Sequence, residues 1–294
     1  MSRDMHEEVT ARILESLENG ANGGDWKPPW VSQAAAGIPS NAATGAAYRG
    51  VNILNLWAEA QIRGFSSSQW ATFRQWQTKG ATVRKGEKAS RVVFYKRLEI
   101  EDEEAEDGRR VLPMLRYSSV FNAAQVDGYE PPPPPPAPNG ADVLAEVDSY
   151  LERTGADWRE NEGRAFYAPQ DDYISLPRRE LFLSTDGYYS TAFHELTHWT
   201  GAPARLARDL SGRFGGAAYA AEELIAELGA AFHCAQWRIT PEPREDHARY
   251  IAHWIRLLKD DKKAIFTAAA RASDSVEFAD RIAGADLERE LVAA

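Results

Sequence analysis

The sequence has a single cysteine, Cys234, in 294 residues. No internal disulfide can form, and zinc sites built from two or more thiolates are excluded, so any metal ion must be held by histidines and carboxylates. Long apolar runs are also absent: no stretch of about 18 consecutive apolar residues occurs, so no membrane span is predicted. The N-terminus, with Asp4, Glu7 and Glu8, is too acidic for a secretory signal. We therefore expect a cytoplasmic protein with no membrane partner.

Positive charge is scarce overall but is concentrated in one part of the chain. The formal net charge is −10, whereas residues 20–98 hold eleven Lys/Arg against three Asp/Glu, a local charge of +8. Residues 131–294 hold 18 Lys/Arg against 27 Asp/Glu, a local charge of −9. Because an acidic surface repels phosphates, only the N-terminal part suits a polyanionic partner.

A proline run separates these two parts. Residues 131–140 read PPPPPPAPNG, and consecutive prolines favour the extended polyproline II conformation over a helix or a central strand. We therefore expect a domain at 1–130, a Pro-rich linker at 131–140 and a second domain at 141–294. Since such linkers are semi-rigid, the two domains are expected to be held apart. A ligand for a polyproline-binding domain is the alternative interpretation of this run.

Periodicity predicts an α+β protein, with a small α+β N-terminal domain and a mainly helical C-terminal domain. In the first domain, helices are expected at 4–19, 50–63 and 68–78, and strands at 90–98 and 111–121 around an acidic loop at 99–108. In the second, a helix at 141–154 and short strands within 164–176 precede helices at 186–200, 217–236, 244–271 and 274–292. Residues 172–176 alternate as a strand, which could be a sheet edge that receives an extended peptide.

The most specific motif is His194-Glu195-Leu196-Thr197-His198. On a helix, the i, i+4 spacing places both imidazoles on one face, where they can bind the same ion. Glu195 then lies beside the open coordination position, where it can act as a general base toward water. The alternative is a pair of hydrogen-bonded histidines on a buried helix face. The motif predicts a metallopeptidase with Glu195 as its catalytic residue.

A third protein ligand is needed to leave one position open in a tetrahedral site. The expected helix at 217–236 offers Glu223 and Glu227, which are four residues apart among apolar residues. We predict that Glu223 binds the metal and that Glu227 accepts a hydrogen bond from a ligand histidine. Glu222 is expected to be a solvated neighbour. Two imidazoles and a carboxylate favour Zn²⁺, with another divalent metal such as Mn²⁺ as the alternative.

Five of the nine tryptophans lie in the basic N-terminal stretch. Aromatic rings interleaved with cations are typical of sites for single-stranded nucleic acids, because bases stack on the rings while cations contact the phosphates. Trp57 and Trp70 fall within predicted helices and are expected to be core residues. The residues predicted to contact nucleic acid are Trp26, Lys27, Trp30, Arg49, Arg84, Lys85 and Lys88.

Several motifs together resemble the ArdC antirestriction proteins of conjugative plasmids. Those before the linker are WKPPW at 26–30, YRGVN at 48–52, WATF at 70–73, RKGE at 84–87 and FNAAQV at 121–126. Those after it are HELTHWTG at 194–201 and AEELIAELG at 221–229. The resemblance implies a single-stranded-DNA-binding domain followed by a zincin-like metallopeptidase domain, which together protect incoming plasmid DNA from host restriction.

Two functions remain open from the sequence. In one, bound single-stranded DNA directs a zinc-dependent peptidase to a protein substrate, such as a host restriction component. In the other, the protein is a DNA-binding shield whose metal only stabilises the fold. Glu195 favours the first, since a structural site has no use for a general base. For stabilising an oxyanion, the sequence does not rank His233, His247, His253, Tyr219 and Tyr250.

Overall fold

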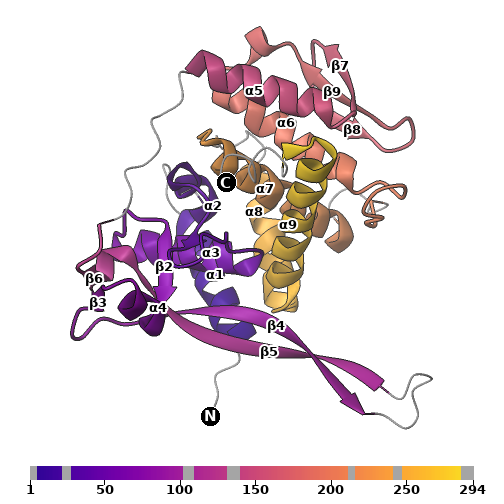
Figure 1. The fold of residues 1–294 in the computed structure, drawn as a ribbon. Helices are drawn as coiled ribbons and strands as arrows, with labels where there is room; N and C mark the ends of the chain where they lie inside the picture. Colours follow the sequence, from indigo (N-terminus) through magenta and orange to yellow (C-terminus); the bar gives the residue numbers. More distant parts are fainter. Residues whose placement is uncertain are drawn as a thin grey trace.

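A computed structural model describes residues 5–21, 28–101, 109–130, 140–210, 216–240 and 247–285. Helices and sheets both occur, so the predicted α+β class is confirmed (Figure 1). Within these ranges no helix has both the length and the apolar character needed to cross a membrane. Most of the predicted linker (131–139) and most of the acidic loop (102–108) lie outside the described residues.

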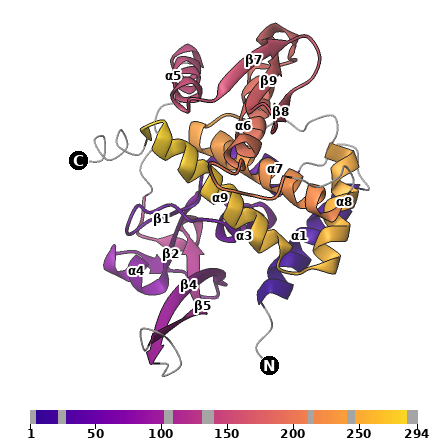
Figure 2. The same cartoon turned by 90° about the vertical axis from the view of Figure 1, so that its right-hand side faces the viewer.

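The N-terminal half combines short helices with a four-stranded sheet. Its elements are α1 (Met5–Ala21), α2 (Pro29–Ser32), η1 (Ala34–Ala36), β1 (Ser40–Asn41), α3 (Val51–Arg63), β2 (Gln69–Thr72), α4 (Phe73–Thr78), β3 (Thr82–Val83), β4 (Ser90–Glu101), β5 (Arg109–Asn122), η2 (Ala123–Gln125) and β6 (Val126–Asp127). The sheet has the order β1-β2-β5-β4, and β3 pairs separately with β6. β4 and β5 form a long antiparallel hairpin that projects from the rest of the molecule (Figures 1 and 2).

The C-terminal half is mainly helical, as predicted. Its elements are α5 (Gly140–Arg153), β7 (Asp157–Asn161), β8 (Phe166–Ala168), β9 (Tyr173–Pro177), η3 (Arg179–Leu181), α6 (Thr185–Thr200), α7 (Ala217–Trp237), α8 (His247–Asp260) and α9 (Ala264–Ile282). The sheet has the order β7-β9-β8, so β9 is the central strand. The expectation that residues 172–176 are a sheet edge is therefore wrong, because β9 is paired on both sides.

Three predicted helices have different limits in the structure. Residues 69–72 of the predicted helix 68–78 form strand β2, which pairs with β5. Thr72 then starts helix α4 through a capping box, in which its hydroxyl accepts a hydrogen bond from the Gln75 amide and the Gln75 side chain accepts one from the Thr72 amide. The predicted helix 244–271 is broken at 261–263, where the Asp261 carboxylate accepts a hydrogen bond from the Lys263 amide. Its last part and the start of the predicted helix 274–292 form one continuous helix, α9.

One hydrophobic core joins the two halves of the chain. Its buried residues include Ile13 of α1, Trp30 of α2, Leu54 of α3, Phe232 of α7 and Ile265 of α9. The expectation that the halves are held apart is therefore wrong. Burial of apolar surface stabilises by about 25 cal/mol per Å², and the many side chains buried in this core hold the two halves together. A second core lies between α5, α6 and β9.

Candidate metal centre

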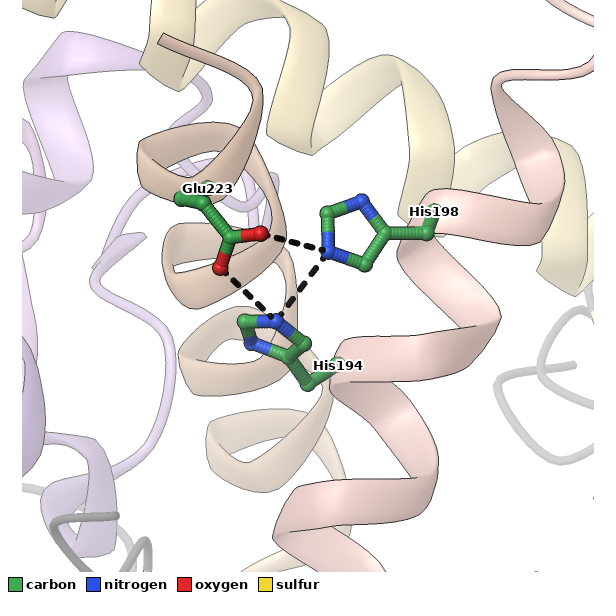
Figure 3. A group of neighbouring side chains, drawn as sticks. All are labelled: His194, His198 and Glu223. Atoms are coloured by element: carbon green, nitrogen blue, oxygen red, sulfur yellow. Dashed lines mark hydrogen bonds and ion pairs between the residues drawn. The ribbon is translucent and has the colours of Figure 1, made fainter. Parts of the chain in front are cut away.

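Helix α6 carries both histidines of the HExxH motif. The Ser184 hydroxyl caps its start by accepting a hydrogen bond from the Gly187 amide over 2.9 Å. Tyr189, Phe193 and Leu196 are buried in the second core. This burial fixes the rotation of the helix and directs His194 and His198 toward α7, with their ring centres 4.8 Å apart (Figure 3).

Helix α7 approaches α6 closely because Gly229 has no side chain. A Cβ atom at this position would lie 2.6 Å from Cγ2 of Thr197, closer than two nonbonded carbons can stand. Thr197 precedes His198 on α6, so the glycine sets the spacing of the two helices at the histidines. This close packing brings Glu223, on the same helix as Gly229, within reach of both imidazoles (Figure 3).

His194, His198 and Glu223 converge on one point. The two Nε2 atoms are 3.2 Å apart, and Glu223 places Oε2 3.6 Å from His194 Nε2 and Oε1 3.7 Å from His198 Nε2. Ligand atoms at about 2.0–2.1 Å from a tetrahedral ion lie about 3.3–3.4 Å from one another. The observed separations are close to these values, so the three side chains fit a divalent cation with little rearrangement. No other group of three potential ligands clusters this tightly within the described residues.

The surrounding carboxylates favour a cation at this point. Burial lowers the pKa of His198, but its hydrogen bond with Glu222 and the charges of Glu223 and Glu195 outweigh that effect, so its pKa lies above the ordinary value. Glu195 follows His194 on α6, and its side chain is only 3% exposed. Glu195 lies outside the group of three ligand atoms but close enough for its charge to act on the site.

Glu222 is part of the site, so the expectation of a solvated neighbour is wrong. Its Oε1 lies 3.1 Å from Nδ1 of His198, and it is clamped by the buried guanidinium of Arg208, whose Nε donates to Oε2 over 3.0 Å and whose Nη2 donates to Oε1 over 2.9 Å. Burial raises the pKa of Glu222, but the bonds with His198 and Arg208 lower it more, so its pKa lies below the ordinary value. Glu222 therefore stays ionised and orients the His198 ring.

Glu227 lies next to His194, whereas Glu222 lies next to His198. Its Oε2 is 3.9 Å from Nδ1 of His194, and its Oε1 accepts a hydrogen bond from the indole of Trp30 over 3.4 Å. The carboxylate thus stands between a histidine of the C-terminal half and a tryptophan of the N-terminal half. The predicted contact between Glu227 and a motif histidine is compatible with this geometry.

Trp30 does not have the surroundings of a base-stacking residue. Its side chain is 1% exposed, and its ring packs edge-on against Trp254 with centroids 6.2 Å apart. The prediction that Trp30 stacks on a nucleic-acid base is therefore wrong, because burial against α7 and α8 leaves no face for a base. Trp57 and Trp70 are buried, as expected. Trp26 and Lys27 lie outside the described residues.

The four other predicted nucleic-acid contacts lie in two places. Arg84, Lys85 and Lys88 belong to the turn between β3 and β4, where Arg84 pairs with Glu87 over 3.1 Å. Arg49 instead precedes α3, and it is half-exposed beside α9, where it forms ion pairs with Asp274 and Glu277.

The oxyanion candidates differ in their surroundings. His233 is buried and stacks on Phe193 with ring centroids 4.8 Å apart, which is the packing expected of a core histidine. Tyr219 and His253 are partly buried. The side chains of His247 and Tyr250, in the first turn of α8, are outside the described part of the structure.

Comparisons with known proteins agree with this architecture. Residues 3–121 match a family model described as the N-terminal domain of the anti-restriction factor ArdC, and residues 145–271 match one described as a zincin-like metallopeptidase. The crystal structure of metal-free ArdC from plasmid R388 is 37% identical, with a TM-score of 0.80, and the match covers 96% of this chain and 98% of ArdC. Its Mn(II)-bound structure is similar, with a TM-score of 0.77 and coverage of 95% and 98%.

Two further relatives differ in length. The uncharacterized protein y4eC of Sinorhizobium fredii is 42% identical over 94% of this chain and 91% of its own length. A DNA primase TraC of Escherichia coli is 37% identical over 92% of this chain, which spans only 19% of that protein. Identity, coverage and fold lead to one assignment: the chain belongs to the ArdC family of antirestriction proteins, with an ArdC-type N-terminal domain followed by a zincin-like metallopeptidase domain.

Proposed function

We propose that the protein binds single-stranded DNA and hydrolyses peptide bonds at a metal site, and that it thereby protects incoming plasmid DNA from restriction in the cytoplasm of the recipient cell. The ligands are His194, His198 and Glu223, and Glu195 is the general base. The ion is Zn²⁺ or another divalent metal such as Mn²⁺. The protein substrate that we propose is a component of the host restriction machinery.

One observation carries the peptidase proposal. Three ligand atoms converge within 4.8 Å of one another, while a further carboxylate, that of Glu195, is buried on the helix of the two histidines without belonging to that group. Burying a carboxylate is unfavourable unless its charge is compensated. A cation held by the three ligands provides such compensation, and a buried base beside an open coordination position is the arrangement that hydrolysis needs.

The reaction assigns separate tasks to these residues. When bound, the ion supplies Lewis acidity toward water and toward a peptide carbonyl. The Glu195 carboxylate accepts the proton that the attacking water loses and then delivers it to the leaving amine. Glu222, held by Arg208, keeps the His198 ring oriented, and Glu227 faces His194 in the corresponding position.

We propose strand β8 as the edge that receives the peptide. It is the outer strand of the β7-β9-β8 sheet, on the side where the sheet packs on α6. A cavity of 590 Å³ opens at its end and is lined by Pro169, Asp171, Pro203 and Arg208. An extended peptide paired with β8 would run along α6, close to the motif histidines.

The alternative is a non-catalytic shield, in which the N-terminal domain covers single-stranded DNA and the metal stabilises the C-terminal domain. The three ligands join α6 to α7, two helices that share the second core, so a bound ion would also stabilise the fold, and this supports the shield. In both alternatives, we propose that the domain at 1–130 provides most of the DNA binding and that the domain at 141–294 holds the metal.

Purified full-length protein distinguishes these functions. The wild type and Glu195→Gln are compared for zinc content and for hydrolysis of an unfolded protein such as casein, with and without single-stranded DNA. The peptidase proposal predicts one metal in both proteins and hydrolysis only in the wild type. Hydrolysis by Glu195→Gln would overturn the role of Glu195, and an inactive, fully metal-loaded wild type would support the shield.

A further inference from the structure

A cavity of 740 Å³ lies where the two halves of the chain meet. Its lining residues come from segments well before and well after the HExxH motif in the sequence. Its walls are the loop before α3, the base of strand β4, and the first half of α9. These elements meet near the base of the hairpin (Figures 1 and 2). We call it the junction groove and define it by Tyr48, Arg49, Phe94, Lys263, Phe266 and Arg271. Its volume is within the range of about 300–1,000 Å³ that is usual for ligand sites.

The walls of the junction groove are fixed to each other. The amide of Gly50 donates a hydrogen bond to the Ser273 hydroxyl of α9 over 2.9 Å. Gly50 has φ +57°, and a Cβ there would lie 3.7 Å from Cα of Ala270, so the loop and α9 are in close contact. Arg49 adds ion pairs to Asp274 and Glu277. A ligand therefore meets a preformed site that contains residues of both halves.

Aromatic side chains line the interior. Phe94 is 47% exposed, which is unusual for a phenylalanine next to a buried core. Phe266 is buried, and its ring packs against His6 with centroids 4.5 Å apart. The exposed ring of Phe94, next to the buried ring of Phe266, offers the flat apolar surface on which a nucleobase stacks.

Cations surround the aromatic interior. The side chains of Arg49 and Arg271 are 58% and 55% exposed, and Lys263 is exposed as well. Among the lining residues, Asp274 is the single carboxylate. It pairs with Arg49 over 3.5 Å and with Arg271 over 3.7 Å, so a phosphate would compete with it for these guanidinium groups. Helix α3 also begins here, at Val51, so its positive end faces the groove. Burial raises the pKa of Tyr48 to about 12, so its phenol stays protonated and adds no negative charge.

We propose that single-stranded DNA binds in the junction groove, with a base stacked on Phe94 and phosphates paired with Arg271 and Lys263. This inference rests on the proposed DNA-binding function. It changes the location of the site, because α9 of the C-terminal half then supplies the phosphate contacts. The turn that holds Arg84, Lys85 and Lys88 is not required for binding.

The test is the affinity of the full-length protein for a fluorescent oligothymidylate, measured by anisotropy at several salt concentrations. Loss of one stacked base typically weakens binding roughly 5- to 150-fold, which is the loss expected for Phe94→Ala. Arg271→Ala should lower the slope of log affinity against log salt by about 0.7, as expected for one lost phosphate contact.

Matched controls come from the same half of the chain. Phe73 is also 47% exposed but begins helix α4, outside the groove, so Phe73→Ala should bind like the wild type. Arg74→Ala removes an exposed cation of helix α4, also outside the groove, and should bind like the wild type as well. An unchanged metal content and melting temperature in each variant show that the fold is retained.

The other results of the binding experiment distinguish failure of DNA binding from failure of the junction groove. A wild type that does not bind the oligonucleotide overturns the DNA-binding function itself. A wild type that binds, with wild-type affinity in Phe94→Ala and Arg271→Ala, overturns only the junction groove. Competition by thymidine monophosphate at the same concentration as the oligonucleotide would show a nucleotide pocket instead of a strand site. Photocrosslinks from a bromodeoxyuridine oligonucleotide should fall within 92–94 or 263–274, and crosslinks confined to 84–88 would contradict the proposal.

Discussion

The indole Nε1 of Trp30 donates a hydrogen bond to Oε1 of Glu227 over 3.4 Å. The same carboxylate places its Oε2 3.9 Å from Nδ1 of His194. Helix α2, in the N-terminal half, thus reaches the carboxylate next to a motif histidine in the C-terminal half. The metal site is therefore supported from both halves of the chain, although all its proposed ligands come from one.

Trp30→Phe tests this relationship. Phenylalanine keeps most of the buried ring but cannot donate to Glu227, which is then freer to move away from His194. Changes behind a metal ligand typically weaken metal affinity ~10–100-fold, and we expect the lower end of this range because the histidine itself remains. Chelator competition measures the effect.

Trp57→Phe is the matched control. Trp57 is buried in the same core, but its indole donates to the carbonyl of Gly37 over 3.1 Å and not to a carboxylate of the site. Both variants lose one hydrogen bond and should lose a similar amount of stability, about 0.5–1.5 kcal/mol. Equal metal affinities in the two variants would show that Trp30 contributes to packing and not to metal binding.

The three glutamates of α7 should respond differently to alanine. Glu223→Ala removes a ligand and should abolish stoichiometric metal binding, whereas Glu227→Ala should weaken it ~10–100-fold. Glu222→Ala should also weaken metal binding and, in addition, leave the buried Arg208 without its carboxylate. Removing one partner of a buried ion pair lowers the free energy of unfolding by about 3–5 kcal/mol. Metal analysis and thermal unfolding measure both effects, and full metal occupancy in Glu223→Ala would refute the ligand assignment.

The spacing of α6 and α7 provides a third test. Gly229→Ala places a methyl group against Thr197 and should destabilise the protein by about 1–3 kcal/mol, as overpacking does, while weakening metal binding. The double variant Gly229→Ala/Thr197→Ala makes room for the methyl group and should recover part of both losses. Gly163→Ala, where a Cβ would meet nothing closer than 3.7 Å, should be neutral.

The convergence of His194 and His198 was predictable because its geometry is local, whereas Glu223 comes from another helix. Two residues four apart on a helix must share a face, and the apolar neighbours of Glu223 indicated a buried helix. Glu222 was misjudged because its burial depends on Arg208, which lies 14 residues earlier in the chain. The position of that guanidinium follows from tertiary packing, which periodicity does not encode.

Trp30 was misjudged for a similar reason. A tryptophan directly after two prolines and three residues after a lysine has the sequence context of an exposed loop, and only the packing of α2 against α7 and α8 buries it. The same packing overturned the expectation of two separated domains. The stiffness of a proline run limits the path of the linker, but it says nothing about whether the segments on either side have apolar faces that match.

The last prediction separates an active peptidase from a shield during plasmid transfer into a restricting host. Glu195→Gln keeps the shape of the side chain but cannot accept a proton, so general-base catalysis, typically worth ~10²–10⁴-fold, is lost while the ligands remain. His194→Ala removes a ligand, so the metal is lost as well. If the peptidase protects the DNA, unmodified plasmid should be restricted in both variants at equal protein levels. If the protein is a shield, Glu195→Gln should protect like the wild type and only His194→Ala should fail, with a lower melting temperature. We expect the first result, because a buried carboxylate beside three convergent ligands has no role in a purely structural site.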